Sequence, residues 1–455
     1  MDSPAQRACG IAAGRLNLAD DAANFSDAHP ALNRSQALIE AERCYYCYDA
    51  PCTTACPTSI DVPAFIARIA QDNVRGAARE ILTANPLGGM CSRVCPTEQL
   101  CEQACVRNTQ EDKPVEIGAL QRYATDAFMA SGGAPLFQRA AATGRKVAVV
   151  GAGPAGLTCA HQLALQGHDV VLFDARPKLG GLNEYGLASY KTPGDFAQKE
   201  IDWLLSVGGI TPRNNQRLGR DFTLDSLLAE HDAVFLGLGL AGVNALGAAE
   251  PQAEGLRNAV DFIADIRQAA DKSMVPVGLR VVVIGGGMTA VDASVQARLL
   301  GADEVTMFYR RGKDALSASW VEQEWAQTHG VNLRLWAAPQ EILVQDGKVC
   351  GVRMACTRME GDRLQVTQEV FDVPADMVLK AIGQTYVATP AGAAIALRDG
   401  RIDTDDEGRT SVPRVWAGGD CRAGGQDLTV QAVEHGKVAA RAMHQALTSA
   451  VAAGV

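Results

Sequence analysis

The sequence predicts an α/β protein: a helical, cysteine-rich domain followed by two Rossmann-like β-α-β domains, with the second inserted into the first. Three observations support this prediction. Eight of the thirteen cysteines lie between Cys44 and Cys105. Glycine-rich turns at Gly151 and Gly285 each follow a short apolar strand and open a helix. A final strand and helix, over residues 415–439, return to the first β-α-β domain, which implies the insertion.

Length and composition place the chain among ordinary multidomain proteins. Its 455 residues exceed the roughly 100–200 residues of a single domain. The 42 basic and 52 acidic residues give a net charge of −10, which argues against nucleic acid and anionic membranes as partners. Because the sequence shows neither a signal-peptide pattern nor an apolar run of about 18 residues, we expect a cytoplasmic protein without a membrane segment.

Changes of pattern along the chain predict the domain limits. Apolar residues recur at helical spacing over residues 62–69 and 77–84, where convincing alternating strands are absent. Further on, strands over residues 147–150 and 170–174 enclose a helix, and a similar unit runs over residues 281–309. The predicted ranges are 1–140 for the helical domain, 141–244 and 386–455 for the first β-α-β domain, and 245–385 for the inserted one.

The cysteines form two runs with the spacing of metal ligands. The runs are Cys44, Cys47, Cys52, Cys56 and Cys91, Cys95, Cys101, Cys105. In two-cluster ferredoxin-like sequences, the last cysteine of a run, before proline, ligates the other iron–sulfur cluster. On this logic Cys44, Cys47 and Cys52 hold one cluster, and Cys56, which precedes Pro57, reaches a second. Two structural zinc sites of four cysteines each are the alternative, which the neighbouring nucleotide motifs disfavour.

The first glycine-rich turn predicts a dinucleotide site. Gly151, Gly153 and Gly156 occupy the positions that serve the tight turn, the approach of the backbone to pyrophosphate, and helix packing. The phosphates then lie at the helix N-terminus. Asp174 ends the next strand, where an acid binds the adenosine ribose. The glycine motif alone is weak evidence, but together with the strand, the helix and the acid it specifically indicates a dinucleotide-binding site.

The second glycine-rich turn is succeeded by basic residues instead of an acid. Gly285 and Gly287 repeat the motif, and Arg310 and Arg311 end the next strand. Arginine can pair with the 2′-phosphate of NADPH, whereas an acid binds the 2′-hydroxyl of NADH, so the pair favours NADPH. A solvated basic turn is the alternative. The two sites fit one FAD and one NAD(P)H, whose hydride transfer requires no catalytic side chain.

The motifs and their flanking residues resemble a known family. The segments are Cys44-Tyr-Tyr-Cys47-Tyr-Asp-Ala-Pro-Cys52, Asn85-Pro-Leu-Gly88 and Val415-Trp-Ala-Gly-Gly-Asp420. They resemble dihydropyrimidine dehydrogenase, above all the FAD subunit of the two-subunit bacterial enzymes, in a wider group that includes the small subunit of glutamate synthase. The resemblance covers nearly the whole chain. It implies FAD, two [4Fe–4S] clusters and NADPH or NADH as cofactors.

The resemblance also implies which residues bind the clusters. The ligands of one [4Fe–4S] cluster match Cys44, Cys47, Cys52 and Cys105. Three ligands of the second match Cys56, Cys95 and Cys101, and its fourth, an unusual glutamine, matches Gln121. This leaves Cys91 as a non-ligand. The alternative for Gln121 is an ordinary residue on a helix surface.

At the nucleotide sites the resemblance implies further roles. Residues matched to FAD are Gly151, Gly153, Gly156, Asp174, Gly181, Leu182, Gly419, Asp420 and Thr429, with Asp420 at the ribityl chain and Thr429 opening a helix toward the flavin. Residues matched to NAD(P)H are Gly285, Gly287, Thr289, Arg310 and Arg311. Ser317 stands where some NADPH-dependent relatives have another arginine, which keeps NADH open.

The function implied by the resemblance is electron input. Hydride from NAD(P)H would reach FAD, and single electrons would pass through both clusters to a catalytic subunit containing FMN and [4Fe–4S]. That partner would reduce uracil or thymine at the 5,6 bond. The family's FMN barrel has no counterpart after the last flavin segment, so we expect a hetero-oligomer. The alternatives are input to glutamate synthase or another ferredoxin-linked enzyme, and an assembly scaffold.

Overall fold

The computed structural model describes residues 10–132, 135–388 and 395–452, which divide into two compact units. Each unit is assembled from separate stretches of the chain. The first contains the described residues up to Ala28, together with Tyr185–Pro193 and Gly242–Thr385. The second contains the described residues of His29–Glu184, Gly194–Ala241 and Tyr386–Val455.

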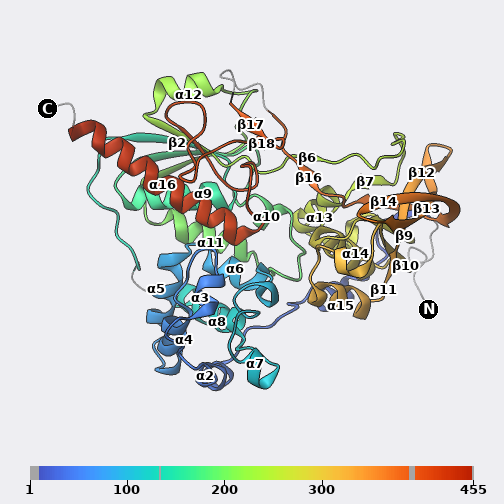
Figure 1. The fold of residues 1–455 in the computed structure, drawn as a ribbon, viewed down its shortest axis with the longest axis horizontal. Coiled ribbons are helices and arrows are strands. Elements are labelled where there is room, and N and C mark those ends of the chain that lie inside the picture. The colour runs from blue at the N-terminus through green and yellow to red at the C-terminus, as the bar shows by residue number, and fades with distance from the viewer. Residues whose placement is uncertain (1–9, 133–134, 389–394, 453–455) are drawn as a thin grey trace. The chain divides into compact units, whose positions relative to one another are not determined.

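The cysteine-rich part of the second unit is helical (Figure 1). Its elements are α2 (Arg34–Glu42), α3 (Pro51–Ala55), α4 (Val62–Ala70), α5 (Val74–Ala84), α6 (Gly88–Val94), the 3-10 turn η1 (Thr97–Gln99), α7 (Asn108–Glu111) and α8 (Ile117–Ala130). Asn33, Asp61 and Asn73 begin α2, α4 and α5, because each side chain accepts a backbone N–H of the first turn. Helices α2, α4, α5 and α8 share one apolar core, against which five cysteines pack: Cys44, Cys52, Cys56, Cys101 and Cys105.

The rest of the second unit is built on a parallel sheet with the strand order β19-β5-β2-β3-β4. The strands are β2 (Lys146–Val150), β3 (Asp169–Phe173), β4 (Ile210–Arg213), β5 (Ala233–Leu236) and β19 (Val415–Ala417), with a small pair β17 (Leu397–Arg398) and β18 (Arg401–Ile402). The helices are α9 (Pro154–Leu165), α10 (Leu182–Tyr185), α11 (Phe196–Leu205), α12 (Leu224–Glu230) and α16 (Thr429–Ala452). Alternate residues of β2 enter two different cores, since both faces of the sheet are covered.

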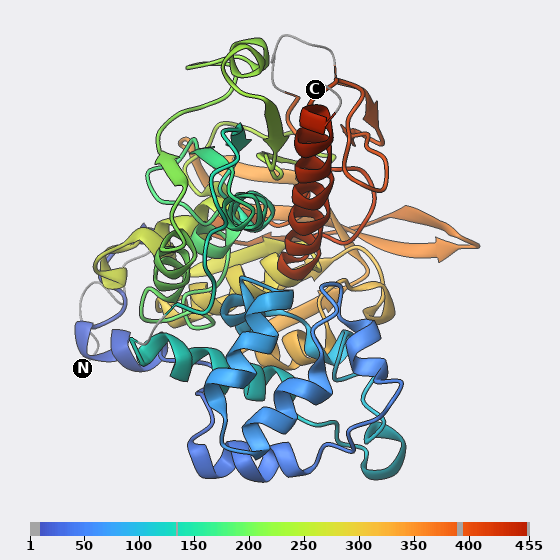
Figure 2. The ribbon, with the colours of Figure 1, turned by 90° about the vertical axis from the view of Figure 1, so that its left-hand side faces the viewer.

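The long helix α16 packs along α9 (Figure 2, red helix). Gly436 makes the close approach possible, because a Cβ there would lie 2.3 Å from the carbonyl oxygen of Ala155. The pairing brings the end of the chain back to the helix that opens after the first glycine-rich turn.

The first unit has its own parallel sheet, with the order β11-β10-β9-β15-β7. Its strands are β7 (Leu256–Asn258), β9 (Arg280–Ile284), β10 (Glu304–Tyr309), β11 (Val331–Leu335) and β15 (Met377–Lys380). Helices α1 (Leu18–Asn24), α13 (Ala259–Gln268), α14 (Met288–Leu299) and α15 (Trp320–Thr328) belong to the same unit, as do the 3-10 turns η2 (Lys272–Met274) and η3 (Lys313–Ala315). An antiparallel sheet is made by β12 (Ala337–Gln345), β13 (Lys348–Glu360) and β14 (Arg363–Pro374). Two short pairs, β1 (Ile11–Ala12) with β8 (Val277–Gly278) and β6 (Gly242–Val243) with β16 (Gln384–Thr385), complete it.

The segment Tyr185–Pro193 leaves the second unit and packs into the first. Ala188 donates its backbone N–H to Asp292 of α14 at 3.1 Å. Lys191 forms ion pairs of 2.7 Å with Asp292 and with Glu322 of α15. Because all three groups are largely buried, removing one would leave a charge uncompensated in the interior. The segment is thus tied firmly to the first unit.

The fold confirms the predicted class, a helical domain followed by two β-α-β domains with the second inserted. One stretch lies elsewhere than its predicted range implied. The described residues up to Ala28 pack with the inserted domain and not with the helices of the predicted range 1–140, because β1 pairs with β8. Within the residues the structure describes, none of the helices has both the length and the apolar character to span a bilayer.

Candidate cofactor sites

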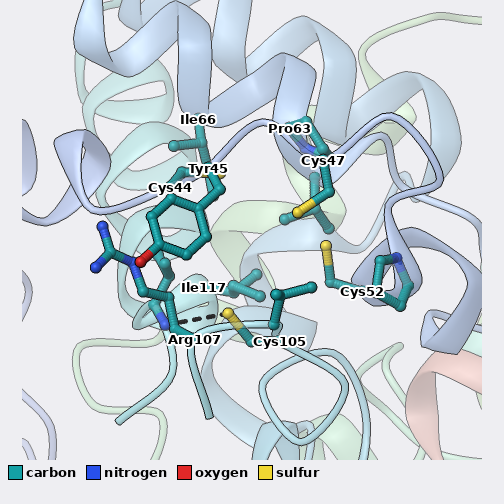
Figure 3. A pocket seen from close by; sticks show the side chains of 13 residues that line it. Cys44, Tyr45, Cys47, Cys52, Pro63, Ile66, Cys105, Arg107 and Ile117 are labelled. Atoms are coloured by element: carbon teal, nitrogen blue, oxygen red, sulfur yellow. Dashed lines mark hydrogen bonds between the residues drawn. The ribbon is translucent and has the colours of Figure 1, made fainter. Parts of the chain in front are cut away.

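The four cysteines predicted to hold the first cluster surround one pocket (Figure 3). The sulfur atoms of Cys47, Cys52 and Cys105 point toward one another, and Cys44 lines the same space. The sulfurs ring this space instead of meeting at one point. No group of three or more His, Cys, Asp or Glu side chains in the described residues is arranged to hold a single metal ion. Apolar side chains that line the pocket include those of Val62, Ile66, Val106, Val115 and Ile117.

The surroundings of these thiols suit thiolate ligands. The backbone N–H of Tyr46 lies 3.4 Å from the sulfur of Cys44, and that of Val115 lies 3.5 Å from the sulfur of Cys105. Burial raises the pKa of the Cys44 thiol and takes the pKa of Cys52 to about 11. Metal binding must therefore displace protons, after which the N–H groups stabilise the charged sulfurs. Four such donors around one pocket fit a [4Fe–4S] cubane.

Three cysteines predicted for the second cluster also lie together. Cys56 and Cys95 end helices α3 and α6. A hydrogen bond with Cys91, burial, and the neighbouring thiols of Cys101 and Cys56 raise the pKa of Cys95. Burial, followed by nearby charges that include the Cys56 thiol, raises the pKa of Cys101. The hydroxyl of Thr58 lies 3.3 Å from the sulfur of Cys56.

Gln121 lies on the inner side of α8, which packs against α6. It is only 7% exposed, which differs from the surface position given as its alternative. Its Nε2 donates to the carbonyl oxygen of Gly88 at 2.6 Å. The amide oxygen is therefore the atom left for a metal, beside the helix that ends at Cys95. Cys91 is buried within that helix.

The residues matched to FAD gather at the start of α9. Gly151 has a φ of 95°, and a Cβ there would lie 2.2 Å from the carbonyl oxygen of Gly237. A Cβ on Gly156 would lie 1.8 Å from the carbonyl oxygen of Gly151, and one on Gly181 would lie 2.7 Å from the Cα of Gly153. Both glycine loops therefore expose bare backbone at one place, as a pyrophosphate cradle requires.

Asp174 and the C-terminal flavin motif complete this site. The carboxylate of Asp174 accepts the N–H of Ala152 at 2.8 Å, and burial raises its pKa. A Cβ on Gly419 would lie 3.0 Å from the Cβ of Ala155, at the start of α9. Burial, reinforced by the charge of Asp427, raises the pKa of the adjacent Asp420 to about 7. A half-buried acid whose pKa is raised in this way favours a hydroxyl-bearing ligand to hydrogen-bond with.

Thr429 is the first residue of α16, as the sequence predicts. Its hydroxyl donates to the side-chain oxygen of Asn183 at 2.9 Å, next to Leu182, which is 39% exposed. The contact ties the start of α16 to the loop that carries Gly181. The glycine loops, Asp420 and Thr429 therefore belong to one continuous site within the second unit.

The residues matched to NAD(P)H meet in the first unit. A Cβ on Gly285 would lie 2.1 Å from the carbonyl oxygen of Ala381, and one on Gly287 would lie 3.0 Å from the hydroxyl of Ser317. Thr289 lies in the first turn of α14. Ser317 also donates its backbone N–H to Gly286, so it lies against the phosphate-binding turn.

Arg310 and Arg311 come directly after β10, and their side chains are exposed. Their backbone is fixed, because the hydroxyl of Thr357 donates to the carbonyl of Arg310 at 2.8 Å and Trp336 donates to that of Arg311 at 3.4 Å. In the described part of the chain, neither guanidinium forms an ion pair. Both charges are thus available to an anionic ligand.

Two residues that sequence reasoning missed lie beside these sites. Asn183 receives the hydrogen bond of Thr429. Glu200 is completely buried in α11 and accepts the backbone N–H groups of Gly89 and Met90. The sequence did contain a sign that Glu200 is buried. It falls on the apolar side of an amphipathic helix whose other buried residues include Phe196 and Leu204. A charge at a core position needs a partner.

Two families match separate stretches of the sequence. Residues 21–133 match "Dihydropyrimidine dehydrogenase domain II, 4Fe-4S cluster". Residues 145–436 match "Pyridine nucleotide-disulphide oxidoreductase". The first covers the helical cysteine domain, and the second covers both β-α-β domains. The description of the first family names a 4Fe-4S cluster, so the metal group of the cysteine domain is an iron–sulfur cluster and not zinc.

Among curated proteins, the chain is 35% identical over 421 residues to the NAD-dependent dihydropyrimidine dehydrogenase subunit PreT of Escherichia coli K12. That match covers 92% of this chain and 97% of the relative. The glutamate synthase [NADPH] small chain of Escherichia coli K12 is 34% identical over 439 residues, covering 91% of this chain and 92% of the relative.

Solved structures show the same two-domain flavoprotein fold. FprA of Mycobacterium tuberculosis in complex with NADPH matches with a TM-score of 0.59 and 18% identity, covering 68% of this chain and 86% of that one. Thioredoxin reductase of T. acidophilum matches with a TM-score of 0.54 and 22% identity, covering 68% and 99%. The chain belongs to the pyridine nucleotide-disulphide oxidoreductase family, as an NAD(P)H-dependent iron–sulfur flavoprotein of the group that contains PreT and the glutamate synthase small chain.

Proposed function

We propose that this chain is the electron-input subunit of a dihydropyrimidine dehydrogenase. It would supply electrons to a separate catalytic subunit that contains FMN and [4Fe–4S] and reduces uracil or thymine to the 5,6-dihydropyrimidine. Support comes from PreT, a dihydropyrimidine dehydrogenase subunit that this chain matches over 97% of its length. Further support comes from Gln121, whose buried amide donates to Gly88 at the start of α6, the helix that Cys95 follows.

The observation that carries the proposal is the continuity of the flavin site with the cysteine domain inside one unit. Helix α16 begins at Thr429, in the flavin site. Two turns later Lys437 donates to the carbonyl oxygen of Thr58 at 3.1 Å, two residues after Cys56. One helix thus contacts the flavin loops at one place and a predicted ligand loop at another.

The ligand sets proposed from this arrangement correspond to the two groups of cysteines. The first cluster is held by Cys44, Cys47, Cys52 and Cys105, and the second by Cys56, Cys95, Cys101 and Gln121. When bound, the nucleotides supply hydride transfer and the clusters supply single-electron transfer. The protein binds and orients them, so no acid–base residue is assigned.

The roles proposed for the chain's own residues are positional. The glycine loops at Gly151 and Gly181 bring backbone to the FAD pyrophosphate, and Asp420 hydrogen-bonds the ribityl chain. The turn at Gly285 does the same for NAD(P)H, with Arg310 and Arg311 at the adenosine end.

The experiment that tests the proposal is an anaerobic titration of the purified chain with NADPH and with NADH. Bleaching of the flavin, EPR signals from reduced clusters and about eight irons per chain are expected, because each cubane holds four. The FMN subunit is then added with uracil. Nucleotide oxidation that depends on uracil should require both subunits, and uracil reduction by this chain alone would contradict the proposal.

A second candidate function is electron input to glutamate synthase, favoured by the match to the glutamate synthase small chain over 92% of that relative. The same titrated chain distinguishes the two. Added to a glutamate synthase large subunit with glutamine and 2-oxoglutarate, it should support no nucleotide oxidation if the first proposal holds.

A further inference from the structure

Glu200 is a buried carboxylate to which the cofactor sites above give no role. It lies in the middle of α11, on the flavin-binding side of the second unit, and none of its surface is exposed. One oxygen accepts the N–H of Gly89 at 2.7 Å, and both accept the N–H of Met90 at 3.2 Å. These donors belong to the first turn of α6, where a helix has unpaired N–H groups and partial positive charge. A flavin-domain carboxylate therefore caps a helix of the cysteine domain.

The turn that Glu200 holds also contacts Gln121. The carbonyl of Gly88 accepts the side-chain amide of Gln121, and the next two N–H groups go to Glu200. The start of α6 packs tightly against α11, because a Cβ on Gly89 would lie 2.5 Å from the ring of Phe196 and 2.7 Å from the Glu200 carboxylate. Cys95 directly follows the last residue of α6. A movement of Glu200 would therefore displace Gln121 at the start of this helix and Cys95 at its end.

Two charged groups face Glu200 from the elements packed against it. Arg93 of α6 lies 3.4 Å from the ring centroid of Phe196 and pairs with Asp126 of α8 at 2.7 Å. Burial raises the pKa of Glu200 to about 8, and Asp126 acts in the same direction. The N–H groups of Met90 and Gly89 and the charge of Arg93 act against it. The carboxylate can therefore gain or lose a proton near neutral pH.

We propose that Glu200 is a positioning residue for the second [4Fe–4S] cluster: it fixes the first turn of α6, whose Gly88 carbonyl holds Gln121 and whose helix leads to Cys95, and its charge acts on that cluster. The inference rests on the proposed ligand set. An electron added to the cluster increases the proton affinity of a nearby carboxylate. Reduction is then accompanied by uptake of a solvent proton at Glu200, so the midpoint potential of the second cluster falls as pH rises.

The test is a redox titration of the purified, cluster-loaded chain, followed by EPR at several pH values. In the wild-type protein, the potential of the second cluster should fall with pH, by at most about 59 mV per unit, which corresponds to a tenfold change in the equilibrium constant. E200Q should raise this potential at alkaline pH and remove its pH dependence, while the first cluster stays unchanged. E200D keeps the carboxylate and should retain the second cluster and its pH dependence.

Asp232→Asn is the matched control, because Asp232 accepts the backbone N–H of Lys146 at 2.8 Å within the flavin domain. It should leave both potentials as in the wild type. Loss of only the second cluster in E200Q, with retention in E200D, would also support the positioning role. An unchanged potential and pH dependence in iron-replete E200Q would overturn the inference. Iron-free wild-type protein would instead contradict the cluster assignment and this inference with it.

Discussion

At the scale of single residues, nucleotide choice depends on Arg310 and Arg311. Their side chains are exposed beyond β10, at the edge where the adenosine ribose is expected. Charge-assisted hydrogen bonds contribute roughly 1.5–3 kcal/mol each. The double variant R310A/R311A loses two such bonds and should therefore weaken NADPH binding by at least about 100-fold while NADH binding changes little. Flavin reduction by stopped flow over a range of nucleotide concentrations measures both.

A neighbouring lysine provides the control for general positive charge. Lys313 lies in the same turn and is also exposed, so K313A should affect both nucleotides equally and weakly. An equal loss for NADPH and NADH in the double arginine variant would mean that the pair is only a solvated turn. In that case the preference for NADPH has no support from this pair, and NADH stays open as the nucleotide.

At the scale of elements, the contact between α9 and α16 supports the flavin site. A Cβ added at Gly436 meets the backbone of Ala155, which cannot move without shifting the first turn of α9. Overpacking of this kind costs about 1–3 kcal/mol. Gly436→Ala should lower the melting temperature and the flavin content together, as measured by thermal unfolding with and without added FAD.

The control for this helix is Arg441→Ala, on its exposed side. The variant should keep both the melting temperature and the flavin content of the wild type. If Gly436→Ala does the same, the helices must separate freely, and the contact does not support the site.

Local patterns predicted two helices of the cysteine domain and the strands and helices around the two glycine-rich turns, but not, for example, the antiparallel sheet of β12, β13 and β14. The strand expected over residues 147–150 is β2 (Lys146–Val150), because a short continuous apolar run is typical of a strand buried on both faces. The helix expected over residues 62–69 is α4 (Val62–Ala70), because apolar residues at helical spacing indicate burial on one face. The pairing of β1 with β8 joins residues far apart in sequence, and no local signal records it. Glu200 falls on the apolar side of an amphipathic helix, but its partners lie on α6, far away in the sequence. The cysteine spacing indicated metal, but only the family resemblance separated Cys91 from the predicted ligands.

At the scale of the whole molecule, acid should act selectively on the second unit. Burial lowers the pKa of His161, His168 and His435 to about 4, and all three lie in that unit. A lowered histidine pKa means that the unfolded chain binds the proton more readily. Stability is therefore intact above about pH 6.5 and is lost as pH falls toward 4. Calorimetry between pH 6.5 and pH 4 should show that the melting temperature of the second unit falls before that of the first unit.

The variant His161→Phe measures how much the buried His161 contributes to the loss of stability in acid. The ring packs beside Phe137 and Trp203, and its Nδ1 has no hydrogen-bond partner in the described residues, so phenylalanine suits the position. The variant should lose less stability between pH 6.5 and 4 than the wild type, by up to about 3 kcal/mol. His329→Phe, in the first unit, is the control and should leave this transition unchanged. A wild-type acid profile in His161→Phe would assign the acid lability to other groups.

The division of both units among separate stretches of chain has a consequence for how the protein is made. A ribosome delivers the N-terminus first, yet β1 must wait for β8, and β2 and α9 must wait for β19 and α16. The first unit is complete only after Thr385 has been made, and the second only near the end of synthesis, so apolar surface of the nascent chain stays open for most of translation. Early release of the polypeptide would leave α9 uncovered, and we expect chaperones to be needed most at that stage.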